Sequence, residues 1–480
     1  MPSGTSVDLG SRRFSLDDQI AFGAASHDVN PMHVDPVAAR RTLTGLPIVH
    51  GVHTLLQALE RWRPAAEPEG PLRLDCEFKQ PIDVDDAVDF HQTVDEQGVT
   101  LLDAVVDRVV CTRVRIAGPA VATAAAPPPA AVGEAIVLAP ATVPCEAAAA
   151  THVGRSYLLA QWAPSLAAAF PHVERRLGRG AVGALAALSY TVGMVCPGLH
   201  SVFSSLTLIA NGATPGAALR VRVLAHEARF GMITMAFDGP LRGELIAFER
   251  APPQRQPRAD ELADRVPPEA FARTRAIVVG GSRGLGELTA KLLAAGGADV
   301  VLTYASGRDD AQRVADEINA CGRGRARPRR CDLSEETDWL ALFGPQAPDA
   351  VFYFATPRIY RKSAELFDRR AFGQFTDTYL DRFASLCLAL EQAASERKVT
   401  VYLPSTVFID QRPKGLTAYA MAKAAAEILA DDLSRSLRRV RVVHTRLPRL
   451  ATDQTAGVRG LDHWTNTEVL LGTIRSVLEP

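Results

Sequence analysis

Two pairs of titratable residues, one near each end of the chain, have the spacing that acid–base chemistry needs. The first is Asp28-Val-Asn-Pro-Met-His33, a carboxylate and an imidazole separated by a short turn-like segment. The second is Tyr419-Ala-Met-Ala-Lys423, a phenol and an ammonium four positions apart. Because positioned groups of these types transfer protons to and from reacting atoms, the sequence predicts two reaction centres.

The first pair suits the reversible loss of water from a 3-hydroxyacyl thioester. Pro31 fixes its own φ and pushes Asn30 toward extended geometry, so a rigid turn is expected to present both side chains. The reaction needs a group that takes the C2 proton, a group that protonates the departing hydroxyl and donors for the enolate-like oxygen. In the alternative interpretation, Asp28 caps a helix and His33 is a surface residue.

The second pair suits carbonyl reduction. A tyrosine and a lysine four apart share one helix face. The ammonium is therefore expected to lower the pKa of Tyr419, which would donate a proton to the carbonyl oxygen as hydride reaches the carbon. Ser405, on the loop after a strand over 399–403, is expected to hydrogen-bond the same oxygen.

A glycine-rich turn precedes the second pair. Residues 275–286 read as a short strand, a run of glycines and the start of a helix, which allows backbone amides to approach a pyrophosphate. A second strand over 299–304 follows at the distance of a βαβ unit, and Tyr304 stands where an NAD-selective site has a carboxylate. Arg283 and Arg308 could both pair with a 2′-phosphate, so NADPH is favoured over NADH, although Arg308 could also merely open the next helix.

The elements that must position these groups fall into blocks. A chain of 480 residues exceeds what one core usually serves. Proline-rich stretches at 124–131 and 251–268 separate three blocks, and the order of long helix, strand, turn and strand occurs in both of the first two. The predicted boundaries are 1–125, 132–250, a linker over 251–270, and 271–480.

The first block resembles a known family. Asp28-Val-Asn-Pro-Met-His33 followed by Gly45-Leu-Pro-Ile-Val-His50-Gly51 is similar to the MaoC-type, (R)-specific enoyl-thioester hydratases, which have a hot-dog fold, over roughly residues 12–125. The resemblance implies that Asp28 and His33 orient and activate water and that the Gly51 amide holds the thioester oxygen. The second block would complete a double hot dog. It has Ala184-Leu-Ala-Ala at the echoing position and no second motif, so it is expected to be non-catalytic, with His200 and His226 as ordinary histidines.

The third block resembles the short-chain dehydrogenase/reductase family over roughly residues 272–455. Its TGxxxGxG motif is matched with Val279 in place of threonine, and Asp332-Leu333 matches the family's aspartate near the adenine. The chain departs from the family at Tyr353-Phe-Ala-Thr356, where Asn-Asn-Ala-Gly is usual, and it lacks the helical asparagine near Thr378 or Tyr379. An altered proton relay, or a relic reductase, would follow. The cofactor residues implied are Gly280, Ser282, Arg283, Gly284, Leu285, Gly286, Tyr304, Arg308, Asp332, Leu333, Tyr419 and Lys423.

Composition limits the partners. A formal net charge of −1 predicts no broad attraction to nucleic acid, and seven cysteines without CxxC spacing favour a reducing compartment and no metal site. With no basic leader before an apolar core, we expect a cytoplasmic protein. The apolar run 181–195 is too short for a membrane span and is expected to be a buried helix. The basic run 323–330 is expected to be a solvated loop, with docking of an acidic carrier protein as the alternative.

Together these patterns predict a multidomain protein: an α+β double hot-dog region followed by an α/β Rossmann-type, doubly wound parallel sheet. The predicted function is bifunctional: NADPH-dependent reduction of a 3-ketoacyl thioester, then dehydration of the (R)-3-hydroxyacyl product to a trans-2-enoyl thioester. The substrate would be carried on coenzyme A or an acyl-carrier protein, and a homodimer is possible. Two alternatives remain: an active reductase with the hot dogs as an acyl-binding scaffold, and a non-catalytic acyl-binding assembly protein.

Overall fold

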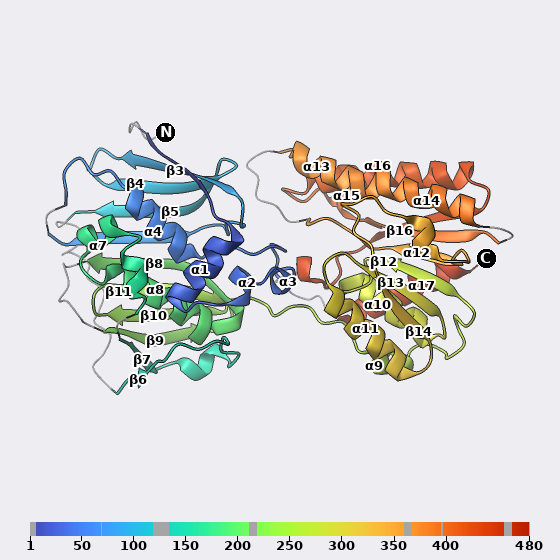
Figure 1. Cartoon of the computed structure of the whole chain (residues 1–480), viewed down its shortest axis with the longest axis horizontal. Coiled ribbons are helices and arrows are strands. Elements are labelled where there is room, and N and C mark those ends of the chain that lie inside the picture. Colours follow the sequence, from blue (N-terminus) through green and yellow to red (C-terminus); the bar gives the residue numbers. More distant parts are fainter. Residues whose placement is uncertain are drawn as a thin grey trace. The chain divides into compact units, whose positions relative to one another are not determined.

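The computed structural model describes residues 6–68, 70–118, 134–160, 162–210, 218–359, 366–394, 397–455 and 463–479. It divides the chain into two compact units, Met1–Pro252 and Pro253–Pro480 (Figure 1). The first predicted boundary, between residues 125 and 132, and the proline-rich stretch 124–131 lie outside the described residues.

One sheet runs through the whole first unit. Its strand order is β1-β3-β4-β5-β2-β8-β11-β10-β9-β7-β6, with antiparallel neighbours except for the parallel pair of β6 and β7. The strands are β1 (Val7–Arg13), β2 (Leu72–Phe78), β3 (Ala87–Val94), β4 (Thr100–Val106), β5 (Val109–Ala117), β6 (Ile136–Val137), β7 (Ser156–Leu159), β8 (Ser201–Ala210), β9 (Leu219–Glu227), β10 (Met232–Asp238) and β11 (Arg242–Glu249).

The order of the strands repeats in mirror image about the centre of this sheet. Reading outward from the centre, β2-β5-β4-β3-β1 on one side corresponds to β8-β11-β10-β9-β7 on the other. The two halves join where β2 pairs with β8 antiparallel, with Leu74 opposite Leu208 and Cys76 opposite Leu206. The repeated order of helix and strands expected from the sequence is therefore present in the backbone.

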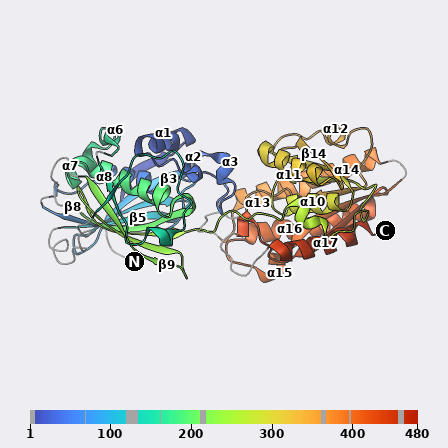
Figure 2. The same ribbon diagram turned by 90° about the horizontal axis from the view of Figure 1, so that it is seen from below.

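The helices of the first unit lie on one face of the sheet (Figure 2). They are α1 (Leu16–Ser26), α2 (Pro31–Val34), α3 (Pro36–Ala39), α4 (Gly51–Arg61), α6 (Pro164–Ala167), α7 (Pro171–Leu177) and α8 (Ala181–Tyr190), and α8 continues as the π-helix η2 (Thr191–Val195). Helix α4 and helix α8 pack against each other, and nearly every side chain of α8 is buried. The expectation of a buried helix at 181–195 is confirmed. Among the described residues, no helix is both long and apolar enough to cross a membrane.

The second unit contains a six-stranded parallel sheet in the order β14-β13-β12-β15-β16-β17. Its strands are β12 (Arg275–Val279), β13 (Asp299–Tyr304), β14 (Arg325–Arg330), β15 (Ala350–Tyr353), β16 (Val399–Thr406) and β17 (Val440–Leu447). In chain order this is 3-2-1-4-5-6, the Rossmann arrangement. The predicted doubly wound sheet is confirmed.

Helices cover both faces of that sheet. One core includes Val278 and Phe352 with helices α10 (Gly284–Ala295), α11 (Arg308–Cys321) and α17 (His463–Leu478). The other includes Val279 and Tyr353 with α12 (Trp339–Phe343), α13 (Arg369–Thr376), α14 (Arg382–Ala393) and α16 (Thr417–Ser436). Successive strand residues thus enter opposite cores, as the two-residue period of a strand requires.

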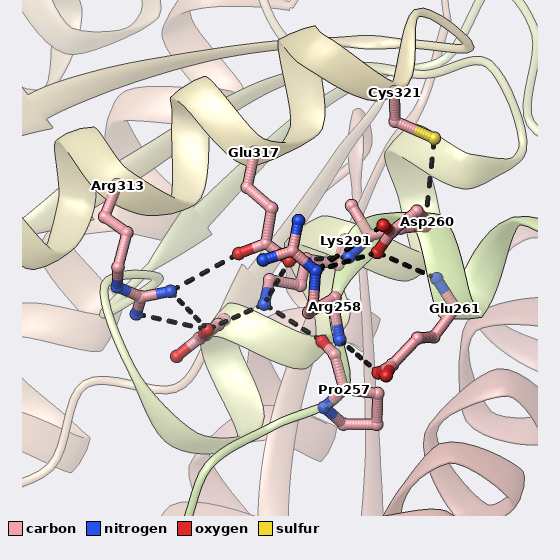
Figure 3. A network of polar contacts seen from close by, with 10 residues as sticks. Pro257, Arg258, Asp260, Glu261, Lys291, Arg313, Glu317 and Cys321 are labelled. Carbon is pink, nitrogen blue, oxygen red and sulfur yellow. Dashed lines mark hydrogen bonds and ion pairs between the residues drawn. The ribbon is translucent and has the colours of Figure 1, made fainter.

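Residues 253–266, part of the predicted linker, pack against the second unit. Helix α9 (Ala259–Ala263) is buried against α10 and α11. The Lys291 ammonium, 1% exposed, donates to the Pro257 carbonyl at 2.9 Å and pairs with Glu287 at 2.8 Å and Glu317 at 3.0 Å (Figure 3). Within the linker expected over 251–270, residues from Pro253 on thus belong to the second unit, and part of them forms a helix.

The basic run 323–330 is also corrected. Residues Arg325–Arg330 form the edge strand β14, paired in parallel with β13, and do not form a solvated loop. The exposed positions of β14 carry the arginines, and Ala326 enters the core. Charged side chains and a proline suit an exposed sheet edge, since both discourage pairing with another strand.

Candidate active sites

The predicted turn between Asp28 and His33 connects α1 to α2. Asn30 caps α2, and its side-chain oxygen accepts from the Met32 amide at 3.2 Å. The Asn30 side-chain nitrogen donates to the carbonyl oxygens of Gly193 at 2.8 Å and Gly198 at 3.1 Å. The turn is thus fixed by backbone carbonyls that follow helix α8, in the second half of the sheet.

Asp28 is buried under the same segment, with 2% of its surface exposed. The Ser189 hydroxyl donates to its Oδ2 at 2.7 Å. A Cβ at Gly193 would come within 2.2 Å of Oδ1, so only glycine fits beside this carboxylate. Burial raises the pKa of Asp28, while His33 and the Ser189 hydroxyl act in the opposite direction. The carboxyl group can therefore hold a proton more readily than an ordinary aspartate.

His33 faces this carboxyl from the other end of the turn. Its Nδ1 lies 2.8 Å from the Ile48 carbonyl oxygen, which can only accept, so the proton of the neutral ring is assigned to Nδ1 and Nε2 keeps its lone pair. Burial lowers the pKa of His33 to about 3. The ring is therefore neutral near pH 7 and able to accept a proton at Nε2.

His50 is a site residue that the sequence analysis quoted within the motif without giving it a role. It is fully buried and stacks on His33 with ring centroids 3.9 Å apart. Its Nε2 lies 2.9 Å from the Asp28 carbonyl oxygen, and its Nδ1 lies 3.0 Å from Oε1 of Gln19. His50 therefore fixes both ends of the catalytic turn, by a hydrogen bond at Asp28 and by packing at His33.

Gly51 is the first residue of α4, as the oxyanion role requires. Its amide has no acceptor among the described residues, in keeping with the unsatisfied donors at a helix start. A Cβ at this position would meet the Phe78 ring at 3.0 Å. The backbone can approach a ligand here because no side chain intervenes, and the N-terminal dipole of α4 favours negative charge.

Asp28, His33 and His50 each offer a ligand atom, and these atoms lie within 4.8 Å of one another. Both nitrogens of His50 face oxygen acceptors, and one nitrogen of His33 does the same. This leaves two free donor groups for a metal, fewer than the three that a catalytic zinc site usually takes from protein. The donor set does not fit a metal centre.

The second predicted pair lies on α16, where Tyr419 and Lys423 occupy one face. The Lys423 ammonium donates to the Pro404 carbonyl at 2.7 Å and lies 3.8 Å from the centre of the Tyr379 ring. Burial lowers the pKa of Lys423 to about 7. Burial also raises the pKa of Tyr419 to about 12, with the hydrogen bond to Thr406 opposing it. The expected lowering of the phenol pKa by Lys423 is not found, and Tyr419 is a protonated donor at neutral pH.

The hydroxyl next to Tyr419 belongs to Thr406 and not to Ser405. Ser405 donates to the Glu427 carboxylate, which is also held by Arg446 at 2.7 Å. Thr406 hydrogen-bonds Tyr419. Neighbouring residues of β16 point to opposite sides of the strand, so a shift of one residue exchanges the two hydroxyls. The sequence analysis ended the strand at residue 403 and placed Ser405 on a loop, whereas β16 continues through Thr406.

Tyr379 occupies the region where the sequence analysis noted a missing asparagine. It is fully buried on the π-helix η4 (Asp377–Asp381), and its hydroxyl is hydrogen-bonded to Thr356. Thr356 is itself one of the residues that depart from the Asn-Asn-Ala-Gly pattern. The two departures therefore contact each other, which makes them one coordinated change beside Lys423.

The glycine-rich turn has the geometry expected for a dinucleotide site. Gly280 and Gly284 have positive φ values of 81° and 58°. A Cβ at Gly286 would lie 2.2 Å from the Gly280 carbonyl oxygen, whereas one at Gly284 would meet nothing within 4 Å. The turn is closed by the Gly281 amide, which donates to the Thr303 carbonyl at 2.9 Å. Open space above Gly284 at the start of α10, together with Ser282 and Leu285 in the same turn, fits a pyrophosphate.

The residues predicted to surround the adenosine part of the dinucleotide cofactor lie at the carboxyl ends of β13 and β14. Tyr304 ends β13 and Arg308 starts α11 with an exposed side chain. Asp332 accepts from the Ser334 amide at 3.0 Å, and the half-buried Leu333 follows it. Arg283 pairs with Asp453 at 3.1 Å, so this guanidinium already has a carboxylate partner. Arg308 is therefore the better placed cation for a 2′-phosphate.

The two units match different protein families. Residues 2–111 match the family model described as MaoC like domain, and residues 274–346 match short chain dehydrogenase. An (R)-specific enoyl-CoA hydratase from Aeromonas caviae is 42% identical over 55 residues, which cover 10% of this chain and 41% of that protein. An NADPH-dependent aldehyde reductase-like protein, chloroplastic, from Arabidopsis thaliana is 32% identical over 195 residues, 36% of this chain and 70% of that protein.

The chain belongs to the short-chain dehydrogenase family. It combines a dehydrogenase domain with a MaoC-like domain, which marks it as an enzyme. Among solved structures, a short chain dehydrogenase from Shigella flexneri is similar with a TM-score of 0.39 and 17% identity, covering 44% of this chain and 88% of that one. In the dehydrogenase domain, Thr406 was missed from the sequence. In the unit that holds the MaoC-like domain, Ser189 and Gly193 were missed because they are contributed by the half without a motif.

Proposed function

We propose that the first unit is a double hot dog that catalyses the reversible dehydration of an (R)-3-hydroxyacyl thioester. The mirrored strand order and the two packed helices α4 and α8 support the fold. The convergence of the Asp28 carboxyl, the His33 imidazole and the Gly51 amide carries the proposal, because these three groups meet the requirements of the reaction.

The protons can be followed through one dehydration. His33 Nε2 takes the C2 proton while the Gly51 amide stabilises charge on the thioester oxygen. Asp28, whose pKa is raised by burial, gives its proton to the hydroxyl as the C3–O bond breaks and water leaves. Return of the proton from the His33 imidazolium to the Asp28 carboxylate restores both groups, and a ring nitrogen of His33 lies within 4.8 Å of an Asp28 carboxylate oxygen.

The dehydrogenase domain is proposed to reduce a 3-ketoacyl thioester to the hydroxyacyl thioester that the first unit consumes. NADPH, when bound, supplies hydride to the carbonyl carbon. Tyr419 donates the proton to the carbonyl oxygen, with Thr406 hydrogen-bonded to the phenol. Lys423 holds positive charge close to that phenol, on the next turn of α16. The name of the Arabidopsis relative and the exposed Arg308 support NADPH.

The direct test assays the two reactions separately in the full chain. Wild-type protein should hydrate a trans-2-enoyl thioester without cofactor and oxidise NADPH with a 3-ketoacyl thioester. Asp28→Asn should abolish only hydration, and Tyr419→Phe only NADPH oxidation. If wild-type protein oxidises NADPH but hydrates no thioester, the first unit is a scaffold. If it does neither while binding thioesters, the chain is an acyl-binding assembly protein.

The carrier of the acyl group, the cellular location and the oligomeric state of the chain are part of the same proposal. Coenzyme A and an acyl-carrier protein both present a thioester on a pantetheine arm, and either would suit the Gly51 amide. All seven cysteines are free, and burial raises the pKa of the Cys76, Cys196 and Cys387 thiols, which suits a reducing compartment such as the cytoplasm. A homodimer can be checked by light scattering.

A further inference from the structure

A half-buried arginine that pairs with no carboxylate among the described residues lies beside the proposed dehydratase site. Arg250 directly follows β11, and its terminal nitrogen donates to the Leu199 carbonyl at 2.9 Å. The Nε of Arg250 is buried and has no hydrogen-bond partner among the described residues. No carboxylate in the described part of the chain forms an ion pair with it.

The position of Arg250 relates it to the catalytic turn. The Leu199 carbonyl that it contacts also lies 3.5 Å from the Asn30 side-chain nitrogen, so one carbonyl separates the guanidinium from the turn. Arg250 also acts electrostatically on His33, where it opposes protonation of the ring. The cation therefore lies close enough to the reacting groups to influence a bound substrate.

A second unpaired polar atom lies beside Arg250 and belongs to His200. The Arg250 amide donates to the His200 carbonyl at 2.8 Å, which places the two residues side by side on paired backbone segments. The Nδ1 of His200 is buried and has no partner among the described residues. His200 and His226 were expected to be ordinary surface or satisfied histidines. The His200 side chain is half-buried with this one unpaired nitrogen, whereas His226 contacts Glu249 at 3.1 Å.

The carboxylates nearest to this pair are otherwise engaged or exposed. Glu249 accepts from the Ala149 amide at 3.2 Å and contacts His226, and the exposed Glu146 acts on His200 only through space. Burial lowers the pKa of Arg250, and no charge of opposite sign offsets that effect. A guanidinium whose Nε is buried without an acceptor gains a hydrogen bond and loses an unpaired donor when an anion binds it.

We propose that Arg250 and His200 form an anion-binding subsite of the dehydratase, which takes a charged oxygen group of the thioester substrate. Two parts of such a substrate have the required chemistry: the phosphates of the carrier arm and a carboxylate on the acyl chain. Either would receive charge-assisted hydrogen bonds from the guanidinium fork, with the His200 ring as a second donor. This inference rests on the proposed thioester chemistry of the site and specifies what the substrate must carry.

The test measures binding to the full chain by titration calorimetry, so that it does not depend on turnover. Three ligands separate the sources of the anion: free coenzyme A, which carries phosphates; the glutaryl thioester of N-acetylcysteamine, which carries only a carboxylate; and the butyryl thioester of N-acetylcysteamine, which carries no anion. Arg250→Gln is compared with Arg179→Gln, which removes the same charge from an exposed position of the same unit. His200→Gln serves as a second variant in case Arg250→Gln does not fold.

Arg250→Gln should weaken binding of coenzyme A or of the glutaryl thioester on the order of tenfold or more, because hydrogen bonds to charged groups are worth that much. The butyryl thioester and the Arg179→Gln control should be unchanged, and His200→Gln should weaken the same ligand less. Loss on coenzyme A alone assigns the subsite to the carrier phosphates, and loss on the glutaryl thioester alone assigns it to an acyl carboxylate. Equal loss on all three ligands, or none, overturns the subsite. Hydration of crotonyl-N-acetylcysteamine by wild-type protein tests the dehydratase proposal independently.

Discussion

The Ser189 hydroxyl donates a hydrogen bond of 2.7 Å to Oδ2 of Asp28, across 161 residues of sequence. Ser189 lies on helix α8. This helix belongs to the half of the first unit that has no Asp-x-Asn-Pro-x-His motif. Together with Gly193, which leaves room for the same carboxylate, Ser189 makes the second half a part of the proposed dehydratase site. The expectation that this half is non-catalytic holds for the motif, but its residues still contact the reacting group.

We predict that Ser189→Ala slows hydration on the order of 10- to 100-fold, the loss expected when a hydrogen bond to a charged group is removed. The measurement is the initial rate of hydration of a trans-2-enoyl thioester. NADPH oxidation by the same sample should be unchanged, because Tyr419 lies in the other unit, and it serves as the internal control. A Ser189→Ala protein with normal hydration would mean that the contact does not position Asp28 for catalysis.

The contact of Tyr419 with Thr406, and not with Ser405, gives a second prediction. Thr406→Ala should lower the turnover number for NADPH-dependent reduction on the order of tenfold or more, since the hydroxyl bonded to Tyr419 is lost. Thr406→Ser should retain most activity. Ser405→Ala should affect folding stability more than turnover, because Ser405 bonds Glu427. The reverse ranking, with Ser405→Ala the slower enzyme, would restore the assignment made from sequence.

Groups that are set by local spacing could be placed from the sequence, whereas groups that meet through distant contacts could not. The glycine turn at 280–286 and the pair Tyr419 and Lys423 lie within single βα or helical segments, so spacing was enough to place them. Ser189 could not be found, since an isolated serine in an apolar helix has no signal of its own. The packing of residues 253–266 on the second unit could not be predicted, because proline content does not show that Lys291 donates to the Pro257 carbonyl.

Acid should destabilise the first unit through its buried histidines. Burial lowers the pKa of His33, His50 and His53 from 6.5 to about 3. Between these values the unfolded chain binds more protons than the folded one, so stability falls as the pH drops from 6.5 toward 3. At about 1.4 kcal/mol for each pKa unit, the loss is on the order of a few kcal/mol for each histidine.

Asp28 acts in the opposite direction, since its pKa is raised and the folded state binds its proton more strongly. It is one group against three, so the net trend should follow the histidines. The measurement is the urea midpoint at which the full chain loses enoyl hydration, between pH 7 and pH 4. His53→Gln, which removes one titrating ring, should flatten the dependence. A midpoint that stays constant over this range would show that these rings are not held neutral in the folded protein.

The Lys291 cluster should be important for the stability of the second unit. Lys291→Met leaves Glu287 and Glu317 buried without this partner, and removing one member of a buried ion pair costs about 3–5 kcal/mol. The urea midpoint at which the full chain loses NADPH oxidation should fall accordingly, while the midpoint for enoyl hydration in the first unit should not change. Lys414→Met, at an exposed position, should shift nothing. Equal midpoints for the two variants would rule out the cluster as a stabilising contact.

The most direct test of the whole account is mass spectrometry of products over time, after the full chain is mixed with NADPH and a 3-ketoacyl thioester. The account predicts a 3-hydroxyacyl thioester first and a trans-2-enoyl thioester next, with Asp28→Asn stopping at the hydroxyacyl stage and Tyr419→Phe giving no product. Hydroxyacyl product that wild-type protein never converts to the enoyl thioester, or the same product mixture from wild type and Asp28→Asn, would contradict the proposal that one chain carries out both steps.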